Sequence, residues 1–149
     1  MLLALLLATH VERAGGTRLV VIVAQASPLA DISSADLRDI YLGRLTRSAS
    51  RHAIVPLIPP QNSAAGDVFL RRFMRMAELD YAQLWIGVVF RGQASSAPLV
   101  ARSPDEAARF VAAHVDAIAI VGDVPNVRNV RVLTVDGKPP DAPDYPLRW

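Results

Sequence analysis

The sequence predicts an α/β fold, in which helices flank a mixed central sheet. Short runs rich in β-branched residues recur along the chain, and between them lie segments whose apolar residues repeat at helical spacing. Capping residues, mostly serine, stand where these helical segments begin. Strands that alternate with helices are typical of layered domains. At 149 residues, of which 52% are hydrophobic, the chain is long enough to form one domain with its own core.

The first third of the chain predicts a strand followed by a helix. Residues 18–25 read RLVVIVAQ, and this density of β-branched residues predicts a strand buried on both faces. Residues 33–36 (SSAD) place a hydroxyl cap and an acidic residue at a helix start. Three apolar residues share one face of that helix: Leu37, Ile40 and Tyr41. Gly43 then ends the helix as a left-handed C-cap.

The middle of the chain predicts a second strand and two more helices. Residues 53–58 (AIVPLI) form an apolar run, and Pro56 within it predicts an edge strand or a bulge, because proline has no N–H to donate. A helix is expected from Asn62 to about Met76. Its apolar stripe is Phe69, Phe73 and Met76. Residues 80–90 predict the next helix, with a buried stripe of Tyr81, Trp85 and Val88 or Val89.

The last third predicts one helix and two strands. Residues 91–102 are expected to form a loop. Residues 103–106 (SPDE) place serine at the N-cap, proline at the first helical position and glutamate at the third. Strands are predicted at 117–121 (AIAIV) and 130–135 (VRVLTV). A turn at 136–137 (DG) then leads into a proline-rich tail.

The residue types argue against an enzyme and against a metal or cofactor site. The chain has no cysteine, so it offers neither a thiol nucleophile nor a thiolate ligand. Its three histidines, His10, His52 and His114, lie far apart and match no ligand spacing. His114 is expected to end a helix instead. No nucleophile elbow and no glycine-rich phosphate loop is present, so we expect no catalysis, no metal and no cofactor.

The charge is modest and scattered. The formal net charge is +2, and the densest basic group is Arg71, Arg72 and Arg75. This group predicts the solvated face of a helix, with a docking surface as the alternative. Basic residues do not alternate with aromatic ones as a stacking platform for nucleic acid requires, so no nucleic-acid partner is expected.

The first sixteen residues form a segment of their own, and residues 17–149 form the domain. Residues 2–8 (LLALLLA) are an unbroken apolar run, which fits the core of a short signal peptide and is too short for a stable membrane span. The run lacks a preceding basic residue, and a polar stretch ending in Gly15 and Gly16 follows it. We interpret residues 1–16 as a degraded or truncated export signal with a linker, which predicts a periplasmic protein. The alternative is a short N-terminal helix or tail.

The order of these motifs resembles a known family. Four segments occur in sequence: 35–43 (ADLRDIYLG), 54–57 (IVPL), 63–69 (SAAGDVF) and 117–121 (AIAIV). The chain closes with VLTVDG at 132–137 and then YPL at 145–147. This order resembles the second lobe and hinge region of the phosphate-binding substrate-binding proteins of ABC transporters, and still more the short, single-lobe exported members of that superfamily. The resemblance covers about residues 18–148.

The resemblance implies a single lobe of the type II periplasmic-binding-protein fold. Members of the family hold a tetrahedral oxyanion between two lobes, where an S-G-T segment at a helix start supplies hydroxyl and backbone N–H groups. Ser63 aligns with the family serine, and Ala64 and Ala65 replace the glycine and threonine. Gly66 stands where the family often has arginine, and a second arginine position of the family falls near Pro59. The ligand-binding candidates are therefore Asn62, Ser63, Ala64 and Ala65, although Ser63 also fits a plain helix cap.

These observations predict a non-catalytic, periplasmic substrate-binding-like protein. It is expected to bind phosphate or another small oxyanion, as part of an ABC transport system or in association with one. The alternative is an envelope protein-interaction module that kept the fold, lost the anion site and docks onto a transporter or a sensor.

Overall fold

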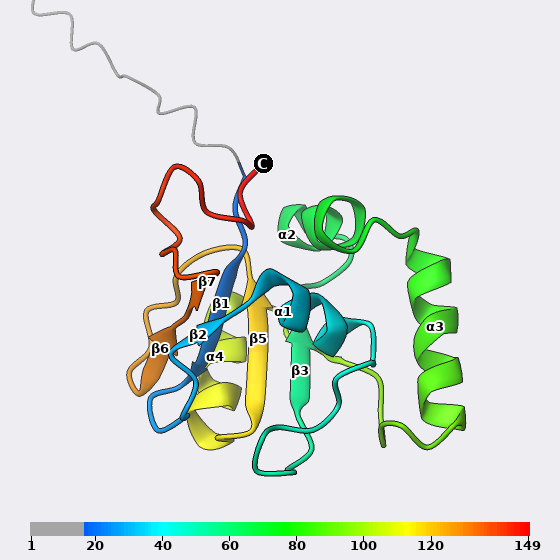
Figure 1. Ribbon diagram of the computed structural model, residues 1–149. Helices are drawn as coiled ribbons and strands as arrows, with labels where there is room; N and C mark the ends of the chain where they lie inside the picture. Colours follow the sequence, from blue (N-terminus) through cyan, green and yellow to red (C-terminus); the bar gives the residue numbers. More distant parts are fainter. Residues whose placement is uncertain (1–16) are drawn as a thin grey trace, which may run out of the picture.

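The computed structural model describes residues 17–149, so the expected export segment, residues 1–16, lies outside the described residues. A five-stranded sheet in the order β4-β3-β5-β1-β6 forms the centre, and β2 and β7 form a second, two-stranded sheet (Figure 1). The strands are β1 (Val20–Ala24), β2 (Asp31–Ile32), β3 (Val55–Ile58), β4 (Leu99–Val100), β5 (Ala117–Val121), β6 (Val130–Val132) and β7 (Thr134–Val135). The helices are α1 (Ser34–Tyr41), α2 (Ala64–Val68), the π-helix η1 (Phe69–Met74), α3 (Glu78–Phe90) and α4 (Pro104–Ala113).

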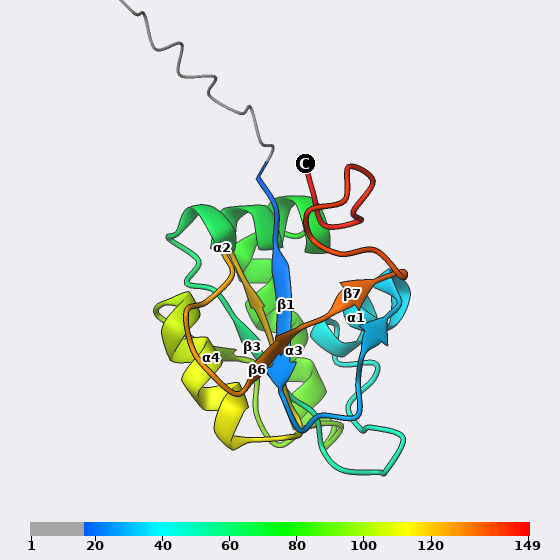
Figure 2. The ribbon, with the colours of Figure 1, turned by 90° about the vertical axis from the view of Figure 1, so that its left-hand side faces the viewer.

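The predicted α/β fold with a mixed sheet is confirmed. Strand β5 pairs parallel with β3 and antiparallel with β1, and every residue of β1 and β5 is buried. One apolar core lies between the sheet and the helices α1, η1 and α3, and a second lies between the sheet and α4. Figure 2 shows the resulting layers, with α4 on one side of the sheet and α1 on the other. Within residues 17–149, no helix combines the length and the apolar character that a bilayer crossing requires.

The local helix signals hold where they were predicted. The hydroxyl groups of Ser33 and Ser103 accept hydrogen bonds from the N–H groups of Asp36 and Glu106, each at 3.0 Å. Gly43 adopts a φ of +70° after α1, as expected of a left-handed C-cap. These signals depend only on neighbouring residues, which is why a sequence can reveal them.

The expectation for Pro56 is wrong, because β3 lies inside the sheet between β4 and β5. The N–H of Val55 donates to the carbonyl of Asp116 on the β5 side, so the next residue, Pro56, faces the β4 side. Strand β4 pairs only with Leu57 and Ile58. The missing N–H therefore falls just before the β4 ladder begins, where no strand needs it.

The single helix expected over 62–76 is also corrected. Ser63 caps a five-residue α-helix, which continues as the π-helix η1 and ends at Arg75 with a left-handed φ of 54°. Four apolar residues of η1 are buried together: Phe69, Leu70, Phe73 and Met74. Met76 lies beyond the helix and is only half-buried, so it does not extend the stripe.

Two short strands went unpredicted, and one predicted strand is divided. The segment expected as one strand over 130–135 contributes β6 to the main sheet and β7 to a parallel pair with β2. The side chain of Asp31 in β2 accepts hydrogen bonds from the Thr134 hydroxyl at 2.5 Å and from the Gly137 N–H at 2.8 Å, and these bonds lower the pKa of Asp31. Strand β4 lies inside the segment expected to be a loop.

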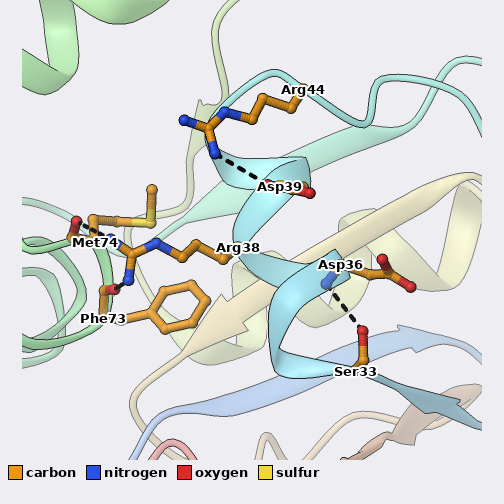
Figure 3. Close-up of polar contacts among 7 residues, drawn as sticks. All are labelled: Ser33, Asp36, Arg38, Asp39, Arg44, Phe73 and Met74. Atoms are coloured by element: carbon orange, nitrogen blue, oxygen red, sulfur yellow. Dashed lines mark hydrogen bonds and ion pairs between the residues drawn. The ribbon is translucent and has the colours of Figure 1, made fainter.

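Arg38 on α1 holds the end of η1 in place. Its two terminal nitrogens donate to the carbonyl oxygens of Phe73 and Met74, at 2.8 and 2.9 Å (Figure 3). The last carbonyls of a helix lack partners within the helix, so this guanidinium satisfies groups that would otherwise be left unpaired.

We expect Arg38→Ala to lower the free energy of unfolding by about 1.5–3 kcal/mol, because two hydrogen bonds from a charged donor are lost. Arg44→Ala is the matched control. Arg44 lies just beyond α1, and its exposed ion pair with Asp39 spans 3.6 Å (Figure 3), so its loss is expected to cost less than about 1 kcal/mol. Urea denaturation of both variants measures the difference, and equal losses would refute the role of Arg38.

Candidate functional site

The start of α2 lies beyond the carboxyl ends of two neighbouring strands. Strand β3 ends at Ile58, and after five intervening residues the chain enters α2. Gly122 follows β5 directly, and a Cβ atom placed on it would lie 2.8 Å from the Cβ atom of Ala65. Open α/β sheets bind ligands in this position, outside the carboxyl ends of the strands. The four predicted site residues, Asn62, Ser63, Ala64 and Ala65, therefore come together at the end of the sheet.

The Ser63 side chain acts as the helix cap. Its hydroxyl accepts a hydrogen bond from the N–H of Gly66 at 3.0 Å and donates one to the carbonyl of Pro60 at 2.5 Å. A serine hydroxyl has a single hydrogen to donate. Ser63 could donate to a ligand only by releasing Pro60.

The backbone N–H groups of the next two residues are free. Among residues 17–149, no hydrogen-bond partner accepts from the N–H of Ala64 or Ala65, as expected for the first turn of a helix. Asn62 and Ala64 are exposed, and Ala65 is half-buried. These two N–H groups are unpaired backbone donors at the start of α2.

Neither of the two positions where the resemblance implied arginine in other members, Gly66 and the position near Pro59, carries a cationic side chain. Gly66 is buried, and a Cβ atom on it would lie 1.9 Å from the carbonyl oxygen of Pro60. Pro59 is buried as well. Sequence reasoning identified Gly66 only as a replaced arginine and missed this packing. The one feature of the sequence that could have indicated this packing is the pair of prolines at 59–60, because their rings restrict the backbone that Gly66 contacts.

Acidic residues stand close to the helix start. Asp67 lies in the first turn, where the helix dipole favours an anionic side chain, and its carboxylate pairs with the Arg71 Nε at 2.7 Å. Asp123 follows Gly122 and is exposed. The attraction for an anion at this site would come from the backbone N–H groups and the helix dipole alone. It would include no charge-assisted bonds from arginine.

The site is an open helix start rather than an enclosed pocket. A hollow of about 900 Å³ lies on the other side of α2 and η1, and its lining includes Gln61, Asp67 and Trp149. The predicted arginine group, Arg71, Arg72 and Arg75, is exposed and also lines this hollow. Asn62, Ser63, Ala64 and Ala65 do not line this hollow, and they line neither the hollow beside Pro56 nor the hollow along α3.

His114, Tyr41 and Tyr81 have structural roles. His114 ends α4 as predicted, with its ring stacked on Phe110 at 4.1 Å. Burial raises the pKa of both the Tyr41 and Tyr81 phenols, so each stays protonated and donates a hydrogen bond to a backbone carbonyl. In the part of the chain that the structure describes, no three side chains of metal-binding type gather closely enough to hold an ion.

Comparison with known proteins supports the fold. No family model and no curated protein matches the sequence. Among solved structures, an ABC-type phosphate transport receptor from Vibrio cholerae matches 85% of this chain with 18% sequence identity and a TM-score of 0.63. PstS from Borrelia burgdorferi matches 90% of it with 12% identity and a TM-score of 0.65. This chain covers 49% and 55% of those two proteins, so it spans about half of their length, as expected of a single lobe.

Proposed function

We propose that this chain, which has the fold of one lobe of these phosphate-binding proteins, is a non-catalytic binding module for a small oxyanion such as phosphate. The observation that supports this function is the pair of free N–H groups of Ala64 and Ala65 at the open start of α2. Asn62 and the cap Ser63 shape the approach to these groups. The module would work in the periplasm, as part of an ABC transport system or beside one.

The proposed binding is weak and relies on the backbone. Uncharged N–H groups form weaker bonds to an anion than arginine does, and the exposed site leaves the anion in contact with water. A dissociation constant near 1 mM, which corresponds to about −4.1 kcal/mol, suits such a site. Tighter capture would need a second lobe to close over the helix start.

Ala64→Pro removes one of the two donors without breaking the helix, and so tests the site. Ala64 is the first helical residue, where proline is favoured, and the ψ of 161° at Ser63 suits a following proline. The substitution removes one of the free N–H groups, whereas Ala64→Ser keeps it. We expect phosphate to raise the Tm of the wild type and of Ala64→Ser, and to raise that of Ala64→Pro by clearly less.

The comparison between the two variants is needed because phosphate and sulfate stabilise proteins in general. That general effect is the same in Ala64→Ser and Ala64→Pro, so the difference between their shifts reports the site. With a Kd near 1 mM, a bound ligand adds about 1.4 kcal/mol at about 10 mM phosphate and about 2.7 kcal/mol at about 100 mM. Identical shifts in both variants across the millimolar range would disprove the proposed anion site.

A second candidate function is an envelope protein-interaction module that docks onto a transporter or a sensor. The observation in its favour is that the Ser63 hydroxyl already donates and accepts a hydrogen bond within the chain, and that Gly66 leaves no room for a cationic side chain. Cross-linking in envelope extracts would test it. A transporter or sensor subunit captured equally by the wild type and Ala64→Pro would favour it, and no reproducible partner would count against it.

The periplasmic location rests on residues 1–16, and it is tested separately. We expect cells that express the full chain to hold it in the periplasmic fraction, and cells that express residues 17–149 to retain it in the cytoplasm. Equal distribution of the two proteins would contradict an export role for the segment.

A further inference from the structure

Helix α3 is apolar on two opposite faces. Its inner face buries Tyr81, Trp85 and Val88 against the core. Its outer face leaves Leu79, Ile86 and Phe90 exposed by 67%, 69% and 91%. No residue from Tyr81 to Phe90 is charged. Apart from the exposed Gln83, the residues from Tyr81 to Phe90 are apolar or aromatic. A helix that is apolar on nearly all sides is normally buried, so the outer face calls for a partner.

The exposed face continues onto the edge of the sheet. Figure 1 shows α3 at the outer side of the molecule, well away from β1 and β6. An apolar hollow of about 560 Å³ runs along α3. Its lining includes Ile86 and Phe90 of α3 and, from the neighbouring segment, Pro98 and Val100. Val100 belongs to the edge strand β4 and is 54% exposed. Contiguous apolar surface of this kind marks an interaction site.

The outer face is complementary to itself. At about 100° per residue, Leu79, Ile86 and Phe90 fall within about 40° of arc and form a straight stripe along α3. When two such helices pack antiparallel, Leu79 of one lies opposite Phe90 of the other. In this register Ile86 lies level with Gln83 of the partner and next to the small residue Ala82, and both of these residues are exposed.

The charges at the two ends of α3 specify the same arrangement. Asp80 lies in the first turn and Arg91 follows the last, both exposed, and neither has an ion-pair partner among residues 17–149. The Arg91 guanidinium runs back beside Gly87, two turns from Asp80 on the same flank of the stripe. A two-fold axis maps each flank onto the same flank of the partner. Asp80 of one copy therefore faces Arg91 of the other, and this ion pair forms twice.

We infer that two copies of this chain associate through α3, antiparallel about a two-fold axis. The apolar stripe supplies the contact, and the two Asp80–Arg91 pairs fix its direction. The pairing leaves the start of α2 open, so it is independent of the proposed anion site.

Sedimentation velocity of the full chain over a range of concentrations tests the association. We expect a reversible dimer for the wild type and a monomer for the double variant Ile86→Glu with Phe90→Asp. Both residues are exposed, so thermal unfolding is expected to show that the fold is kept. The matched control is Val124→Glu, which changes an apolar residue that is 49% exposed in the loop after β5, away from α3, and should leave the dimer intact.

An exchange of the two charges tests whether the two α3 helices pair antiparallel. Asp80→Arg and Arg91→Glu are each expected to weaken the dimer about tenfold, because each places like charges together twice. The double variant restores the opposite charges and should recover affinity to within about threefold of the wild type. A monomeric wild type, a dimer that survives Ile86→Glu with Phe90→Asp, or single variants without recovery in the double would each overturn the inference.

Discussion

Gly66→Ala is expected to lower the free energy of unfolding by about 2–3 kcal/mol, or roughly 5–10 °C in Tm. The added Cβ atom would lie 1.9 Å from the carbonyl oxygen of Pro60 and 2.8 Å from the Cα atom of Gln61, and both are backbone atoms. The Pro60 carbonyl also accepts from the N–H and the hydroxyl of Ser63. Moving it away would weaken the cap of α2 together with the turn that precedes it.

The direction of this change in stability is informative, because alanine otherwise stabilises a helix interior by about 1 kcal/mol relative to glycine. Gly87→Ala is the matched control. Gly87 also lies inside a helix, but a Cβ atom there meets only the flexible guanidinium of Arg91, at 3.0 Å. We expect Gly87→Ala to be neutral or to stabilise by up to about 1 kcal/mol. Urea denaturation at one fixed protein concentration compares the two, and equal effects would contradict the contact with Pro60.

Phe69→Ala is expected to cost about 3–5 kcal/mol of stability, which is a large share of the 5–15 kcal/mol typical of a domain. Phe69 is 1% exposed and stands where α2 becomes η1. Its ring contacts three others, with centroid distances of 5.4 Å to Tyr41, 5.6 Å to Tyr81 and 6.1 Å to Phe73. The substitution leaves a cavity at the point where α1, η1 and α3 meet.

The matched control for Phe69 is Phe110→Ala. Phe110 lies on α4, is only half-buried and stacks on His114. Its loss is expected to cost about 1 kcal/mol, because little apolar surface is exposed anew and one aromatic contact is removed. Guanidinium denaturation measures both variants. A cost for Phe69→Ala within about 1 kcal/mol of that for Phe110→Ala would show that the aromatic cluster is not central to the core.

The candidate site was only partly visible in the sequence. The position of Ser63 at a helix start could be predicted, because a cap depends on the few residues that follow it. The contact of Gly122 with Ala65 joins residues 57 positions apart, and no local pattern reports it. The same holds for the outer face of α3: the sequence shows an apolar helix, but only the packed molecule shows which of its sides is left uncovered.

The sequence by itself determined the alternation of strands and helices, the buried strands β1 and β5, and the caps at Ser33, Ser63 and Ser103. These features follow from hydrophobic runs and from hydrogen bonds between near neighbours, and both depend on only a few consecutive residues. Tertiary structure alone decided the interior place of Pro56, the short strands β2 and β4, the division of residues 130–135 and the π-helix. Each of these depends on a partner far along the chain, and a two-residue strand or a widened helical turn forms only where such a partner satisfies its backbone groups.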